Sequence, residues 1–116
     1  MAGDIPVDRY LASRERWVEL DPGLAVRVRR PAEARIPALL QRGDIEAYAA
    51  CVVGWRGFTG AMLLGAALAS DTPAPFDPEL WREVALDNVE WCNKIAEAVV
   101  QDCTAFLQAR DDARKN

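Results

Sequence analysis

The chain has 116 residues, about the size of one domain, and its apolar fraction of 51% can supply a small core. Its net charge is −4, but residues 1–60 carry +1 and residues 61–116 carry −5. An acidic chain without a basic stripe is a poor candidate for nucleic-acid binding, because phosphate neutralisation supplies most of that affinity.

The residues that most often carry enzyme chemistry are scarce. There is no histidine, which removes the commonest general base and the commonest metal ligand. The cysteines Cys51, Cys92 and Cys103 form no Cys-x-x-Cys pair, and an odd count without a leader-like N-terminus indicates a reducing, intracellular setting. We therefore expect no catalytic residue, no cofactor and no metal site, with the thiols packed as small apolar side chains.

A β-hairpin is predicted within residues 14–30, after a polar arm over residues 1–13. Asp21-Pro22-Gly23 predicts the turn, because proline fixes one turn dihedral and glycine accepts positive φ. The flanking strands should run over about 15–20 and 25–29. A lone hairpin is marginal in water, so it should pack on helices or on a partner.

Helices are predicted over residues 32–109. Apolar spacings of three and four first predict a short helix and then a longer one that ends near Val53. Gly43-Asp44 separates the two, with Asp44 as the cap of the second, and Gly54 suits the left-handed position after it. The run AMLLGAALA, residues 61–69, fits either a short buried helix or an extended loop.

The clearest boundary lies at Asp77-Pro78, a strong N-cap followed by proline at the first helical position. Phe76 and Trp81 around it match a hydrophobic staple. This helix should run to about Leu86. The pair Asp87 and Glu90 then predicts a cap for an amphipathic helix over about 89–109. Residues 110–116 are polar and should fray.

The predicted fold is therefore mainly α (α+β), with a short N-terminal β-hairpin followed by about four helices packed as one small domain over residues 1–116. A membrane span over residues 51–69 is not expected, because Arg56 near its middle and four glycines are costly there.

The stretch GWRGFTG, Gly54–Gly60, resembles a glycine-rich phosphate loop only at first sight. It lacks the Gly-Lys-Ser or Gly-Lys-Thr end of a phosphate loop and follows a predicted helix rather than a strand. We interpret it as a helix stop and tight turn beside the soft apolar run 61–69. Whether Trp55 faces the core or a partner is left open.

The order of these motifs resembles the tail assembly chaperones of long-tailed bacteriophages and prophages. VVGWRGFTG comes first, a loop with Asp71 follows, and PFDPELWREVALDNVEWCNKIAEAVV completes the pattern, which covers about residues 48–100. Those small helical proteins tend to carry a Gly-Trp-x-Gly turn and a Pro-Phe-(Ser/Asp)-x-Glu helix start. The run 61–69 departs from the family pattern, being longer and more apolar than the charged loop expected there.

The resemblance implies a non-enzymatic protein of the host bacterial cytoplasm that binds the tape measure protein, keeps that helical client soluble and aids recruitment of tail tube subunits. It would not remain in the mature virion. Two alternatives are a structural head–tail or minor tail component and a small helical protein-binding adaptor. The last helix could also pair with the same helix of a second copy, so a homo-oligomer is possible. Six side chains are the predicted partner-binding residues: Trp55, Phe58, Met62, Leu63, Leu64 and Trp91.

Overall fold

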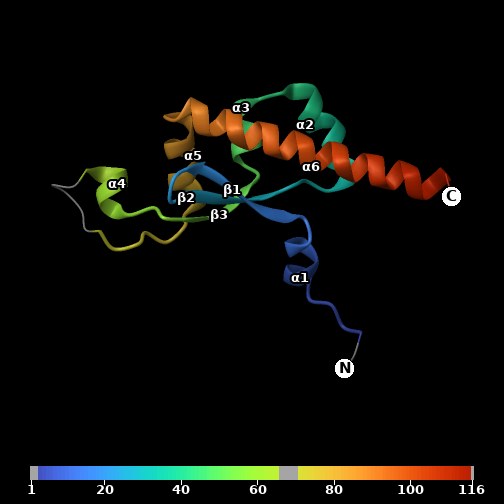
Figure 1. Cartoon of the computed structure of the whole chain (residues 1–116), viewed down its shortest axis with the longest axis horizontal. Coiled ribbons are helices and arrows are strands. Elements are labelled where there is room, and N and C mark those ends of the chain that lie inside the picture. Colours follow the sequence, from blue (N-terminus) through green and yellow to red (C-terminus); the bar gives the residue numbers. More distant parts are fainter. Residues whose placement is uncertain (1–2, 66–70, 116) are drawn as a thin grey trace.

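The computed structural model describes residues 3–65 and 71–115, which form a mixed α+β fold with helices over one face of an antiparallel sheet (Figure 1). Its extents are 59 × 41 × 23 Å. The described elements follow the chain as α1 Val7–Ala12, β1 Glu15–Asp21, β2 Leu24–Arg29, the 3-10 helix η1 Glu33–Arg35, α2 Ile36–Arg42, α3 Ile45–Ala49, β3 Val52–Arg56, α4 Gly60–Leu64, α5 Pro78–Leu86 and α6 Val89–Lys115.

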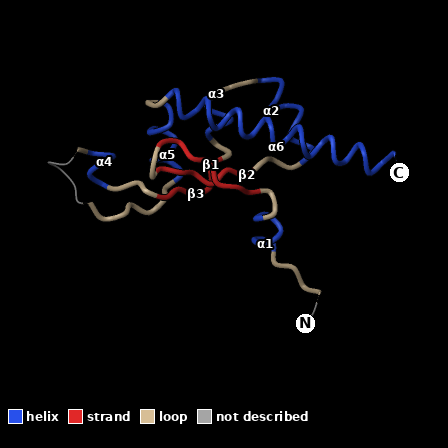
Figure 2. The backbone as a smooth tube through the Cα atoms, viewed as in Figure 1, coloured by secondary structure: helices blue, strands red, loops and turns tan. Residues whose placement is uncertain are grey.

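The predicted hairpin is confirmed as β1 and β2, and Gly23 in its turn has a φ of +84°. The sheet contains a further strand, β3, which pairs with β2 in the antiparallel order β1-β2-β3 (Figure 2). Val18, Val26 and Trp55 lie side by side across the three strands. Because side chains alternate along a strand, this row faces the helices and the neighbouring residues face the other way.

The strand β3 corrects the prediction of a helix that ends near Val53. Helix α3 ends at Ala49, and Val52, Gly54 and Trp55 belong to a strand. Gly54 is not left-handed, since its φ is not positive. Val52 and Val53 fit a helical period, but antiparallel pairing with β2 decides the conformation of this segment, with Val52 opposite Val28 and Gly54 opposite Arg27.

Helix α5 has the predicted bounds, and the Asp77 carboxylate accepts hydrogen bonds from the backbone N–H groups of Glu79 and Leu80. Asp87, predicted as the N-cap of the last helix, is instead the C-cap residue of α5. The Asn88 carbonyl accepts the first bonds of α6.

Two further differences concern the ends of the chain. The predicted polar arm contains α1, and the tail predicted to fray continues α6 as far as Lys115. In Figure 1, α1 and α4 project away from the body that α6 and the sheet form. The described residues thus hold more helices than the four or so predicted.

The core lies between the sheet and the helices α3, α5 and α6. Leu20, Val26 and Val28 of the sheet and Ile95 and Val99 of α6 are fully buried there. Arg16 anchors the edge strand, since its guanidinium Nε lies 2.9 Å from the Asp102 carboxylate of α6. The buried apolar residues hold the sheet against α6, and this surface ion pair adds only a little to that stability.

Candidate functional site

The segment after β3 is organised around an aromatic cluster. Trp55 stacks on Phe58 with 4.5 Å between ring centroids, and Phe76 and Trp81 meet Trp55 edge-on at 5.3 and 6.4 Å. The Trp55 indole N–H donates to the Ala74 carbonyl at 2.8 Å, which satisfies its polar atom. Trp55 and Phe58 are 9% and 1% exposed, so the prediction that they lie on a partner-binding surface is wrong, and both belong to the core.

Trp91 is half-buried at the end of the same cluster. Its ring meets Phe58 edge-on with 5.8 Å between centroids. Its indole N–H donates to the Asp21 carboxylate at 2.8 Å, which ties α6 to the turn of the hairpin. Its contacts within the chain therefore account for this tryptophan, and its predicted role toward a partner stays a prediction.

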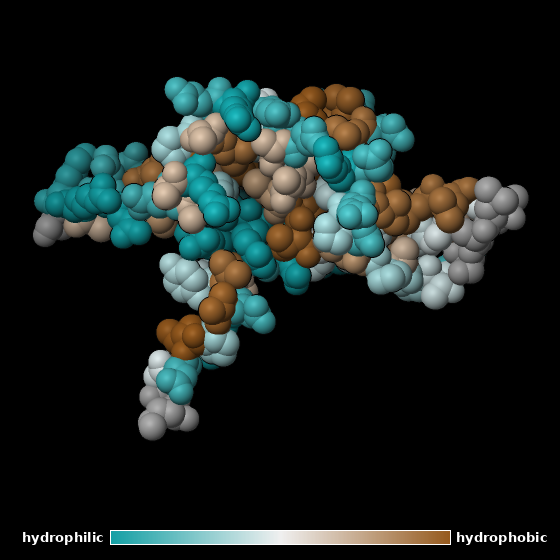
Figure 3. Space-filling view, turned by 180° about the vertical axis from the view of Figure 1, so that it is seen from behind, coloured by the Kyte–Doolittle hydropathy of each residue, from teal (hydrophilic) through white to brown (hydrophobic). Residues whose placement is uncertain are grey.

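The remaining predicted residues lie on α4. The Thr59 hydroxyl caps this helix by accepting from the Met62 backbone N–H at 3.1 Å. Leu63 packs on the core, whereas Met62 and Leu64 are exposed, Leu64 by 63%. Figure 3 shows apolar surface over the projecting part that carries α4. Residues 66–69, the rest of the predicted apolar run, lie outside the described residues.

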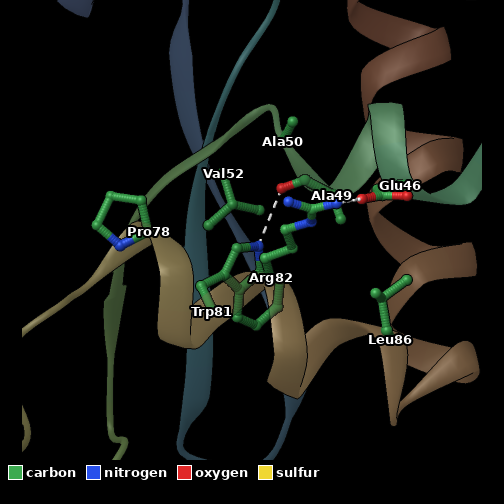
Figure 4. A pocket seen from close by; sticks show the side chains of 8 residues that line it. All are labelled: Glu46, Ala49, Ala50, Val52, Pro78, Trp81, Arg82 and Leu86. Atoms are coloured by element: carbon green, nitrogen blue, oxygen red, sulfur yellow. Dashed lines mark hydrogen bonds and ion pairs between the residues drawn. The ribbon is translucent and has the colours of Figure 1, made fainter.

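A pocket that the sequence did not predict lies between α3 and α5. We call it the α3–α5 pocket, and its volume is about 300 Å³ (Figure 4). Apolar side chains form most of its wall, and a charged pair lies at its side. The lining residues are Glu46, Ala49, Ala50, Val52, Pro78, Trp81, Arg82 and Leu86.

Two contacts hold the two walls of this pocket in place. The Trp81 indole N–H donates to the Ala49 carbonyl at 2.9 Å, and Arg82 forms an ion pair with Glu46 (Figure 4). Both contacts join α5 to α3. Trp81 is 2% exposed, so its ring is fixed by the core and forms the floor of the pocket. Leu86 lies at the rim and is 43% exposed.

The capping residues in the sequence predict where α3 and α5 begin, but they do not predict the pocket between these two helices. Asp44 caps α3 by accepting from the Glu46 backbone N–H at 2.9 Å, as predicted, and Asp77 caps α5. Trp81 was interpreted only as half of a staple. No local sequence pattern indicates this pocket, because Trp81 forms its wall with Ala49, which lies 32 residues earlier in the chain.

The three thiols are poorly suited to chemistry. Burial raises the pKa of Cys51 to about 11, and burial likewise raises the pKa values of Cys92 and Cys103. The Cys92 thiol lies 3.0 Å from the Ala85 carbonyl, as a packed side chain would. In the parts of the chain that the structure describes, no group of cysteine and carboxylate side chains could hold a metal ion. None of the described helices is long and apolar enough to span a bilayer.

The chain matches no protein-family model, no curated protein and no solved structure. The resemblance to tail assembly chaperones therefore rests on the order of the sequence motifs, from VVGWRGFTG to the helix that starts at Pro78.

Proposed function

We propose that this chain is a non-catalytic tail assembly chaperone of a long-tailed phage or prophage. It binds an amphipathic helix of the tape measure protein in the bacterial cytoplasm, keeps that client soluble and aids recruitment of tail tube subunits. It leaves before the virion is complete. The motif order from VVGWRGFTG to the helix that starts at Pro78 supports the choice of this family. The observation that supports binding of a helix is the α3–α5 pocket, with its apolar wall and its adjacent ion pair.

The shape and chemistry of this pocket suit a helical client. A helix binds in a groove through apolar side chains at positions i, i+3 and i+4, and one large side chain fills a pocket of this size. The rigid Trp81 floor loses little side-chain freedom on binding, since it is already held by Ala49. Arg82 and Glu46, whose side chains are 65% and 44% exposed, can meet charges that flank the apolar stripe of the client.

Co-purification of the tape measure protein from the same genome tests the proposal. We expect Leu86→Glu to reduce the recovered client at least tenfold, because it places a charge at the apolar rim of the pocket. Leu80→Glu is the matched control, since Leu80 lies on the same helix, is 38% exposed and does not line the pocket. Circular dichroism confirms that both variants are folded.

The residues predicted on α4 form a separate arm of the same experiment. A Met62→Glu and Leu64→Glu double variant reduces recovery if the client extends over α4 and leaves it unchanged if the pocket is the whole site. The proposal fails if wild-type chain recovers no client, or if Leu86→Glu and Leu80→Glu bind it equally. Mass spectrometry of purified virions tests whether the chain leaves before the virion is complete. A stoichiometric amount of the chain in virions would indicate a structural component instead of a chaperone.

A further inference from the structure

A second pocket, of about 440 Å³, lies between α1, the end of β2, η1 and the start of β3. Four of the residues that line it are arginines, Arg14, Arg29, Arg30 and Arg35, and none is acidic. We call it the arginine pocket. Such a local excess of positive charge is unexpected in a chain whose net charge is −4.

Backbone hydrogen bonds bring these arginines together. The Arg30 backbone N–H donates to the Arg14 carbonyl at 3.1 Å, where the hairpin ends. The Arg29 N–H donates to the Cys51 carbonyl at 2.8 Å, which joins this end of β2 to the start of β3. The Arg35 N–H donates to the Ala32 carbonyl at 2.8 Å in η1. The pocket thus lies at one end of the sheet, where β2 ends and β3 begins, and not on a loop alone.

The side chains of the four arginines have few anionic partners. Glu15 is the acceptor for Arg29 at 2.6 Å, and it also serves Arg27 at 3.3 Å. Arg30 lies over the Phe106 ring, 3.7 Å from its centroid, and donates to a backbone carbonyl. Within residues 3–65 and 71–115, Arg14 and Arg35 form no ion pair.

Two further observations indicate that positive charge here is not compensated. The Nε of Arg14 is buried and has no hydrogen-bond partner among the described residues. Burial and, next, the charge of Arg14 lower the pKa of Arg30. An anion bound in the pocket would offer acceptors to the guanidinium N–H groups that line it and would offset their positive charge.

We propose that the arginine pocket binds a phosphate group, either free or carried by a small organic molecule. Guanidinium groups donate two parallel hydrogen bonds to phosphate oxygens, and several of them can share one phosphate because it offers more oxygens and more charge than a carboxylate. Leu11 and Val53 supply an apolar wall for an organic part, and the volume is in the range of small-molecule sites. This site is distinct from the client pocket and does not depend on the proposed function.

Titration calorimetry of the isolated full chain at constant ionic strength tests this site, with inorganic phosphate and adenosine monophosphate as probes. We expect saturable binding by wild type and roughly tenfold weaker binding by Arg35→Gln. Arg42→Gln is the matched control, because Arg42 is also an exposed arginine without an ion pair among the described residues, yet it does not line the pocket. Its affinity should equal that of wild type.

The two probes separate the two sources of phosphate. Equal affinity for both indicates free phosphate, and tighter binding of the nucleotide indicates that the apolar wall holds an organic part. Arg35→Lys, which keeps the charge but loses the planar fork, should fall between wild type and Arg35→Gln. The proposal is overturned if wild type shows no saturable binding of either probe. It is equally overturned if Arg35→Gln and Arg42→Gln weaken binding to the same extent, which would indicate diffuse charge screening.

Discussion

Replacement of Gly57 by alanine should be among the most destabilising single-methyl changes in this chain. Gly57 follows β3 and has a φ of +86°, in the left-handed region that L side chains rarely adopt. A Cβ atom there would lie 1.9 Å from the Gly23 carbonyl oxygen in the hairpin turn. The substitution therefore strains its own backbone and also forces apart two segments that the fold brings together.

The cost of Gly57→Ala is the sum of two terms. A positive φ costs a non-glycine residue about 1–2 kcal/mol. The overlap with Gly23 is with backbone, not with a side chain that can rotate, so relief requires the turn to shift, and overpacking of this kind costs about 1–3 kcal/mol. We expect a loss of about 3 kcal/mol in the free energy of unfolding, a large part of the stability of a small domain.

Urea denaturation followed by circular dichroism measures this loss, and two other glycines separate its terms. Gly43→Ala has the positive φ, +59°, but no atom within 4 Å of the added Cβ, so it should cost about 1 kcal/mol. Gly54→Ala lacks the positive φ and meets only the movable guanidinium of Arg27 at 3.3 Å, so its effect should be smaller than that of Gly57→Ala. A loss for Gly57→Ala no greater than that for Gly43→Ala would refute the steric argument.

Three smaller predictions follow from single contacts. Because burial raises the pKa of Cys51 from 9.0 to about 11, its alkylation in the folded chain should stay slow at pH 8, and fast alkylation there would contradict this. The free energy of unfolding should fall as the pH rises from 9.0 to about 11, because the thiol ionises first in the unfolded chain. Asp77→Ala should cost about 1 kcal/mol by urea denaturation, because two N–H groups lose their cap, while Asp77→Asn should keep most of that stability; equal losses would rule out capping. Trp81→Phe should cost about 1–3 kcal/mol, since the buried Ala49 carbonyl loses its indole donor, and a thermal melt unchanged from wild type would contradict this.

Local chemistry accounts for what the sequence predicted correctly. The turn at Gly23 needs a residue that accepts positive φ, and the cap at Asp77 needs a short acceptor before proline, so both can be read within four residues. The outline of an α+β domain and the bounds of α5 follow from such signals. The hairpin strands were predicted in the same way.

Long-range pairing accounts for what the sequence did not show. Val52 and Val53 follow an amphipathic helix and fit its period, and only the register with β2, where Trp55 lies opposite Val26, makes them a strand. This register turns Trp55 inward and so removes it from the predicted partner surface. The α3–α5 pocket escaped prediction for the same reason, since Ala49 and Trp81 meet only in the folded chain.

At the end of α6, a small free energy decides whether residues 110–115 are helical or frayed. Residues 110–115 are polar but are mostly good helix formers, so extending a helix that already exists is nearly neutral in free energy. Glu33 lies 3.1 Å from Arg110 and 3.6 Å from Arg114, and the three side chains are 39–65% exposed. Pairs of this kind contribute only about 0.2–1 kcal/mol each. This small stabilisation is sufficient to keep residues 110–115 helical, because the free energy of extending the helix is close to zero without it. It comes from Glu33, more than 70 positions earlier, so the composition of the C-terminal residues does not show it.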